Sequence, residues 1–253
     1  MNSKAHQVGP HISVKAETIF TISGFKVTNS LLLSSIVFVF FLIIALVYSR
    51  EFLKNQKSRF FYFFTYALKS LYDLFYSVFG EKTDYFFPLV ASFFFFILFQ
   101  NEAGLIPGVG TILVKIQEGN SQIFAPLLRG NTADLNSTLS LALISVGFSQ
   151  YVGVKHLGLG NYLKKFINVK NPMVFFTGIM ETISELSKVV AFSFRLFVNI
   201  FAGEVIIAIV AFLIPVLFSF PFLLFEIFIG FIQAIVFSML SAVFFSMAME
   251  EAH

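Results

Sequence analysis

Long apolar runs separated by short polar segments dominate this chain of 253 residues. A helix that crosses the hydrocarbon core of a membrane needs about 20 predominantly apolar residues. Runs near this length are Leu31 to Ser49, Tyr85 to Gln100, Asn136 to Val154, Met173 to about Leu213, and Phe222 to Met249. The pattern predicts an all-α integral membrane protein with five membrane-crossing helices.

A sixth segment, Phe60 to Phe79, is apolar but carries Lys69 and Asp73 four residues apart. Both charges fall on one side of a helix, which favours a helix lying at the membrane interface over an ordinary membrane-crossing one. Pro215 to Pro221 marks a turn between the last two apolar runs. The last two crossing helices are therefore expected to form a long hairpin.

Composition supports this fold class and excludes several functions. Hydrophobic residues make up 57% of the chain and charged residues only 12%, against about 25% charged in a typical soluble domain. There is no Cys, and the four His are dispersed, so neither a metal nor a haem site is expected. The chain has no Gly-x-x-x-x-Gly-Lys-[Ser/Thr] phosphate-binding loop. We expect no cofactor, no nucleic-acid partner, and no enzymatic activity of the chain by itself.

The distribution of Lys and Arg predicts the topology. Cytoplasmic loops of membrane proteins are enriched in these residues. The segments Arg50–Arg59 and Lys155–Lys170 are basic, whereas 101–136 is nearly balanced in charge. This alternation predicts that the two basic segments lie inside and 101–136 outside. Residues 1–30 are then an outer N-terminal segment, and 31–253 form the membrane domain.

Ionisable side chains inside membrane helices are costly and mark functional sites by default. The run from 173 to 213 contains Glu181, Glu185, Lys188, Arg195, Asn199 and Glu204. At about 100° per residue, all but Glu204 fall within roughly 80° of one another. This helix is therefore predicted to carry one polar stripe, with Glu204 turned towards a neighbouring helix.

The last apolar run repeats the pattern, because Glu226, Gly230, Gln233 and Ser241 share one helical face. If Gln233 lies level with Arg195, then Glu204 and Glu226 lie about 13 and 10 Å towards the outside. Glu181 lies about 21 Å from Arg195 on the inner side. The spacing predicts carboxyl groups in both halves of the membrane, with one cation between them.

A guanidinium group does not deprotonate in proteins, so Arg195 cannot relay protons. It can interrupt a proton path and attract a carboxylate on a moving partner. Three other interpretations remain open: an Arg195 paired with Glu185 or Glu204 for helix packing alone, a proton- or cation-coupled secondary transporter or ion channel, and a structural membrane subunit. The transporter is disfavoured because no inverted repeat is apparent.

Residues 187–204 resemble the signature of subunit a of F-type ATP synthases. The core is Arg-Leu-Phe-x-Asn-x-x-Ala-Gly-Glu, from Arg195 to Glu204. Other resembling segments are Asn101 with Gly104–Gly108, Thr132–Asn136, Gln233-Ala234 and Ser246–Glu251. They occur in order over most of residues 28–253. This sequence has Asn131 where the family usually has Pro, and Val198 where Gly is usual.

The resemblance implies roles for these residues. Arg195 would face the essential carboxylate of the rotating c-ring. Glu204, Glu226, Asn199 and Gln233 would line an outer half-channel, in which the family commonly pairs one Glu with one His. Glu181, Ser184 and Ser187 would lead to the inner side, and Glu185 is an additional acid of open role. The last two helices would be tilted against the ring.

The same resemblance implies partners and a location. The partners would be the c-ring subunits, the peripheral-stalk subunit b and the remainder of the ATP synthase, with the proton as the transported ion. The long N-terminal segment favours a bacterial plasma (inner) membrane over the mitochondrial inner membrane.

Overall fold

The computed structural model describes residues 16–22, 24–54, 56–110, 112–118, 121–166, 172–213 and 219–249. Its long helices are α1 (Asn29–Phe52), α2 (Arg59–Phe79), α3 (Thr83–Gly104), α4 (Leu135–Leu157), α6 (Pro172–Leu213) and α7 (Ser219–Met249). The short helices are α5 (Leu159–Phe166) and the 3-10 turns η1 (Gly80–Lys82) and η2 (Asn131–Ala133). The strands are β1 (Thr18–Ile22), β2 (Phe25–Thr28), β3 (Pro107–Gly110), β4 (Leu113–Glu118) and β5 (Ser121–Pro126).

The predicted all-α membrane fold is confirmed. Five helical stretches of the described chain are long and apolar enough to cross a membrane, and α2, η1 and α3 together form one of them. Each expected helix begins and ends within about four residues of its predicted bounds. Residues 215–218 of the expected turn lie outside the described part of the chain. Pro221 lies in the first turn of α7, where proline is tolerated.

Helix α2 has one buried face. Phe61, Leu71, Phe75 and Phe79 are buried, and the last three are spaced by four residues. Lys69 and Asp73 are exposed, as the sequence pattern predicts for an interfacial helix. Ser58 caps the helix by accepting a hydrogen bond from the backbone N–H of Phe61.

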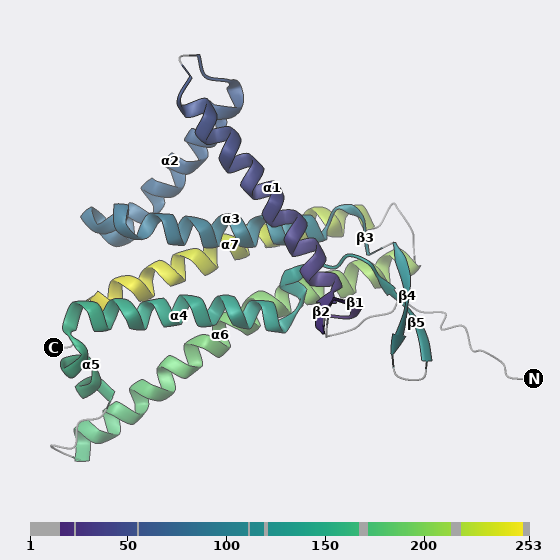
Figure 1. Cartoon of the computed structure of the whole chain (residues 1–253). Coiled ribbons are helices and arrows are strands. Elements are labelled where there is room, and N and C mark those ends of the chain that lie inside the picture. Colours follow the sequence, from purple (N-terminus) through teal and green to yellow (C-terminus); the bar gives the residue numbers. More distant parts are fainter. Residues whose placement is uncertain are drawn as a thin grey trace, which may run out of the picture.

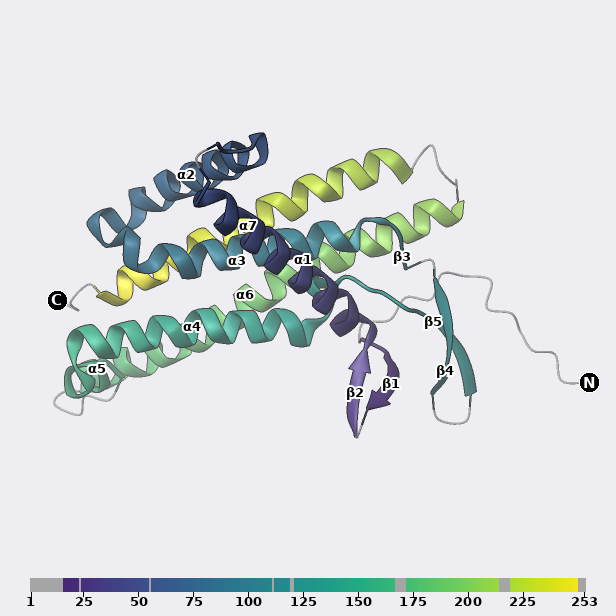
Figure 2. The same ribbon diagram turned by 45° about the horizontal axis from the view of Figure 1, so that its top comes forward.

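Helix α7 packs against α2, α3, α4 and α6. Figures 1 and 2 show α4 and α6 side by side below α3 and α7. Helix α1 crosses α3 obliquely, and α2 leads from the end of α1 back to the start of α3. The strands and the start of α1 lie at one end of this bundle, which we call the hairpin end. Helix α5 and the last residues of α7 lie at the other, the basic end. The hairpin end corresponds to the side predicted to be outside.

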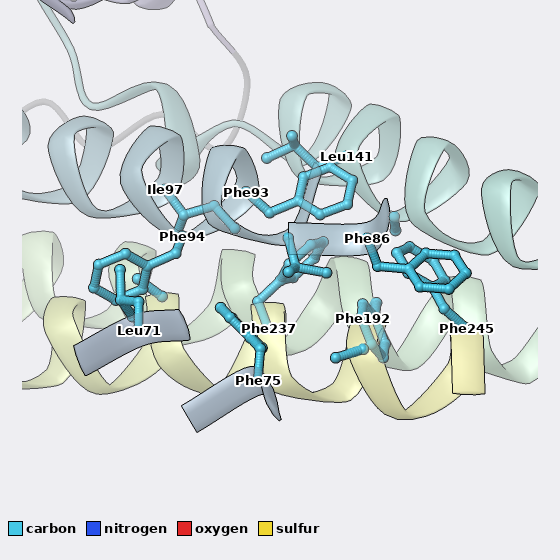
Figure 3. Close-up of a cluster of buried hydrophobic side chains, with 14 of the residues drawn as sticks. Leu71, Phe75, Phe86, Phe93, Phe94, Ile97, Leu141, Phe192, Phe237 and Phe245 are labelled. Atoms are coloured by element: carbon cyan, nitrogen blue, oxygen red, sulfur yellow. The ribbon is translucent and has the colours of Figure 1, made fainter. Parts of the chain in front are cut away.

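Phenylalanine is the most frequent residue in the core of the bundle (Figure 3). Phe75 and Phe245 are fully buried, and the rings of Phe192 on α6 and Phe237 on α7 lie 4.9 Å apart, centre to centre. Lipid is as apolar as these rings, so van der Waals packing and hydrogen bonds have to hold membrane helices together.

Small hydroxyl side chains supply such hydrogen bonds around α4. Ser145 bonds Ser241 of α7 at 2.7 Å, Thr138 bonds Ser193 of α6 at 3.3 Å, and Ser149 donates to the Phe244 carbonyl at 3.1 Å. These bonds hold α4, α6 and α7 in register, and α6 and α7 carry the predicted polar residues.

Two antiparallel hairpins, β1–β2 and β4–β5, were not predicted. The buried side chain of Asn29 connects them to α1, because it accepts a bond from the Glu17 backbone N–H (3.1 Å) and donates to the Pro126 carbonyl (3.2 Å). Helix α5 was not predicted either, and lies within the segment expected to be a basic loop.

Candidate functional site

Arg195 lies near the middle of α6 on an exposed face. Within the described part of the chain its guanidinium forms no hydrogen bond or ion pair. Glu185 pairs with Lys188 (2.7 Å) and Glu204 lies 3.7 Å from Arg129, so neither acid is the packing partner considered for Arg195. A recess of about 260 Å³ lies beside Arg195, on the side towards the basic end, and is lined by Ser184, Ser187, Lys188, Ala191, Phe192, Leu240 and Phe244.

Towards the hairpin end, Asn199 connects α6 to α7. Its amide donates a hydrogen bond to the side-chain oxygen of the buried Gln233 at 2.9 Å. This hydrogen bond joins the two helices one turn from Arg195, while the contact of the Glu226 carboxyl with Gly203 keeps α7 close to the expected register. Spacing within each helix could not establish which residues of α6 and α7 face each other, because that depends on packing between the helices.

Glu226 and Glu204 lie at similar depth, as the spacing predicts. Glu226 is only 4% exposed. Its carboxyl lies directly against Gly203, the neighbour of Glu204, at the place that a side chain on residue 203 would occupy. One carboxyl oxygen of Glu226 has no hydrogen-bond partner among the described residues. The buried carboxyl therefore has room only because residue 203 is glycine.

The loop between α3 and α4 places Arg129 and Gly130 beside Glu204, which the sequence did not predict. The Arg129 Nε atom lies 3.7 Å from the Glu204 carboxylate, and a Cβ on Gly130 would lie 2.7 Å from the same carboxylate. Arg129 is 8% exposed. Arg129 lies just before Thr132–Asn136, which resembles a segment of the subunit a family, and this position was the one hint in the sequence. Helical periodicity cannot connect a loop residue to α6.

The end of α3 adds Asn101 and Glu102. The Asn101 amide donates to the Gly230 carbonyl of α7 at 3.0 Å. Glu102 is half-buried beside the same glycine. The hairpin-end cluster is thus formed by three acids from three helices, Glu102, Glu204 and Glu226, together with Arg129 from the loop.

Towards the basic end, Glu185 belongs to a network that joins three helices. Gln150 of α4 donates to Glu185 at 2.7 Å, and Tyr162 of α5 hydrogen-bonds Gln150. Lys188 donates to the same carboxylate and lies 4.9 Å from the centre of the Phe244 ring. An i, i+3 ion pair of this kind stabilises a helix locally. Glu185 therefore has a structural role that the sequence left open.

Glu181 lies one turn before Glu185, partly buried near Tyr162. Burial, together with the nearby Glu185 and Glu181, raises the pKa of Tyr162 to about 12. The hydroxyl thus remains a hydrogen-bond donor at neutral pH. Ser184 and Ser187 are exposed and line the recess below Arg195. No cluster of three or more His, Asp or Glu able to hold a metal ion occurs among the described residues.

Comparison with known proteins gives a consistent result. Residues 31–246 match the family described as ATP synthase A chain. ATP synthase subunit a of Syntrophobacter fumaroxidans is 35% identical over 195 residues, which cover 76% of this chain and 72% of that protein. The subunit a of Trichlorobacter lovleyi is 31% identical over 245 residues, 96% of each chain. The chain therefore belongs to the ATP synthase A chain family, and is a multi-pass membrane protein that serves as a proton-translocating subunit of an ATP synthase.

Proposed function

We propose that this subunit provides two offset half-channels for protons, separated by Arg195. The proton enters on the hairpin side, travels on a carboxylate of a rotating ring of c subunits, and leaves on the basic side. The main support for this proposal is that Arg195 is exposed and unpaired within the described chain. An acid cluster lies on one side of it and the Ser184–Ser187 recess on the other.

The outer half-channel consists of Glu204, Glu226, Asn199 and Gln233. A proton relay needs groups within hydrogen-bond reach of one another, directly or through one water. The Glu226 carboxyl lies against Gly203, the residue before Glu204, and Asn199 is bonded to Gln233 one turn from Arg195. The acids exchange protons, while the two amides orient water towards the ring carboxylate.

The inner half-channel consists of Glu181, Ser184 and Ser187, with Glu185 at its wall. Ser184 and Ser187 line the recess that reaches Arg195, and Glu181 lies further towards the basic end. Glu185 is held by Lys188 and Gln150, so its contribution is to fix the wall of the path and supply negative charge there.

Arg195 acts as a barrier and as a partner for the ring. Its permanent positive charge repels a hydrated proton in a medium of low dielectric constant and attracts the deprotonated ring carboxylate. Arg195→Ala tests this role: the complex is expected to assemble but to lose ATP-driven proton pumping.

The same proposal assigns the subunit a place in the membrane and in the complex. Residues 1–30 form a segment outside the membrane and 31–253 the membrane domain, in a bacterial plasma membrane. The exposed apolar face around Arg195, with Val190, Phe194 and Val198, faces the c-ring. The peripheral-stalk subunit b and the catalytic sector complete the complex, and ATP chemistry takes place in the catalytic sector.

The contact between Gly203 and Glu226 gives a first quantitative expectation. In Gly203→Ala, the new methyl group would occupy the place of the Glu226 carboxyl and displace it. We expect passive proton conduction through the membrane sector to fall about 10-fold, because a relay group moved out of hydrogen-bond reach loses its function. Conduction is measured in vesicles stripped of the catalytic sector.

Gly147→Ala is the matched control, since a side chain on Gly147 meets open space in α4. It is expected to leave conduction unchanged. Normal conduction by Gly203→Ala would mean that the Glu226 carboxyl need not lie against α6.

A further inference from the structure

The third acid of the hairpin-end cluster, Glu102, has no role in the outer half-channel described above. In the sequence it is one of the acidic residues of segment 101–136, whose positive and negative charges nearly balance. In the structure it lies within the last turn of α3, half-buried and facing α7. Its carboxyl oxygen would be 3.4 Å from a Cβ on Gly230. Glu102 thus approaches α7 where that helix has no side chain.

Gly230 lies between two residues of the proposed outer half-channel, Glu226 and Gln233. Gly230 lies four residues after Glu226 and three before Gln233 on the same buried face of α7, about 6 and 4.5 Å along the helix. The interval from Glu226 to Gln233 is therefore about 10 Å, which is longer than a hydrogen bond or a single bridging water can span. The Glu102 carboxyl reaches α7 within this interval.

Unpartnered polar atoms mark the same interval. Among the described residues, the Glu226 Oε1, Asn101 Oδ1 and Gln233 Nε2 atoms are buried without a hydrogen-bond partner. All three residues are at most 4% exposed. Buried polar atoms are normally satisfied by ordered water when protein supplies no partner. Two of these atoms belong to one face of α7 and the third faces it from α3, so water bound between the two helices would satisfy all three, with Glu102 beside it.

We propose that Glu102 is an additional proton-relay residue, positioned between Glu226 and the Asn199–Gln233 pair. Protonated Glu226 gives its proton through a bridging water to the Glu102 carboxylate, so that Glu226 becomes the carboxylate and Glu102 the acid. The net charge of the pair is unchanged by the step. Glu102 then passes the proton on towards the ring carboxylate. This inference rests on the proposed half-channel and adds a relay residue to it.

The test is passive proton conduction per assembled complex, in vesicles carrying the full complex from which the catalytic sector has been removed. Glu102→Gln keeps the size and hydrogen bonding of the side chain but cannot carry a carboxyl proton. We expect conduction to fall about 10-fold or more, with Glu102→Asp restoring most of it. Unchanged conduction in Glu102→Gln, or equal loss in both variants, would overturn the proposal.

A double variant separates a relay in series from a parallel route. If Glu226 and Glu102 act in one sequence, Glu226→Gln combined with Glu102→Gln conducts about as slowly as Glu226→Gln alone, because effects of residues acting as a unit are not additive. Multiplied losses would contradict the series order. Glu81→Gln, at an exposed acid of η1, is the matched control and should conduct normally.

Gly230→Ala is a second test of the proposal, and it leaves every acidic residue in place. Its methyl group would lie 3.1 Å from the Asn101 Cβ atom and 3.4 Å from the Glu102 carboxyl, and so crowd both from α7. Slower conduction is expected here too. If Glu226→Gln blocks conduction while the Glu102 and Gly230 variants do not, this inference alone fails. If Glu226→Gln also conducts normally, the proposed outer half-channel fails with it.

Discussion

Arg195→Ala is expected to abolish ATP-driven proton pumping, with a loss of at least about 100-fold, in a complex that still assembles. The guanidinium is exposed and makes no hydrogen bond or ion pair within the described chain, so its removal breaks no polar contact among the described residues of the subunit. What is lost is the fixed charge that blocks a direct path and attracts the ring carboxylate. Pumping is measured as ATP-dependent acidification of inverted vesicles.

Arg59→Ala is the matched control for this experiment, because Arg59 is an exposed arginine at the start of α2, far from the α6–α7 pair in sequence. It should pump normally. Retained pumping in Arg195→Ala would contradict the barrier role. Failure of Arg195→Ala to assemble would support a structural subunit whose polar residues serve packing alone.

Glu226→Gln is expected to have the second largest effect, a loss of about 100-fold in passive proton conduction. Its carboxyl is almost fully buried between α6 and α7, and a positioned acid–base group contributes about 10²–10⁴-fold to proton transfer. Glutamine keeps the volume beside Gly203 but has no exchangeable carboxyl proton. Conduction is followed as the proton uptake of potassium-loaded vesicles after addition of valinomycin.

Glu226→Asp separates chemistry from packing. It is one methylene shorter and retains the titrating group, so it should recover a large part of the conduction lost in Glu226→Gln. Equal conduction by the glutamine variant and the unsubstituted protein would exclude Glu226 from the path. A loss in both variants with poor assembly would point to a packing role.

Much of the fold could be predicted from the pattern of apolar runs. Each of the long helices is encoded locally, since its length and hydrophobicity are properties of consecutive residues. The α6 and α7 faces follow from helical periodicity in the same way. The buried face of α7, with Glu226, Gly230 and Gln233, lies where this spacing puts it.

The contacts between elements could not be predicted in this way. The register of α7 against α6 cannot be derived from either helix alone, because it is fixed by long-range packing. Arg129 and Gly130 reach Glu204 only because the loop after α3 folds back over α6, and no periodic signal marks a loop residue.

The pairing of Glu185 with Lys188 could have been found from the sequence. The two residues are three apart on one helix, a spacing at which opposite charges meet. Its connection through Gln150 to Tyr162 could not, because α5 lies in a segment whose Lys164 and Lys165 favour a basic loop.

The central claim is that Arg195 separates two aqueous paths which open to opposite sides. The chain has no Cys, so single cysteines can be introduced without background. Ser187 lies eight residues before Arg195 in the basic-side recess, and Asn199 lies four residues after it. In the assembled complex, silver ions should reach Ser187→Cys only from the basic side and Asn199→Cys only from the hairpin side. Reaction of both cysteines from the same side would show one continuous pore and contradict the account.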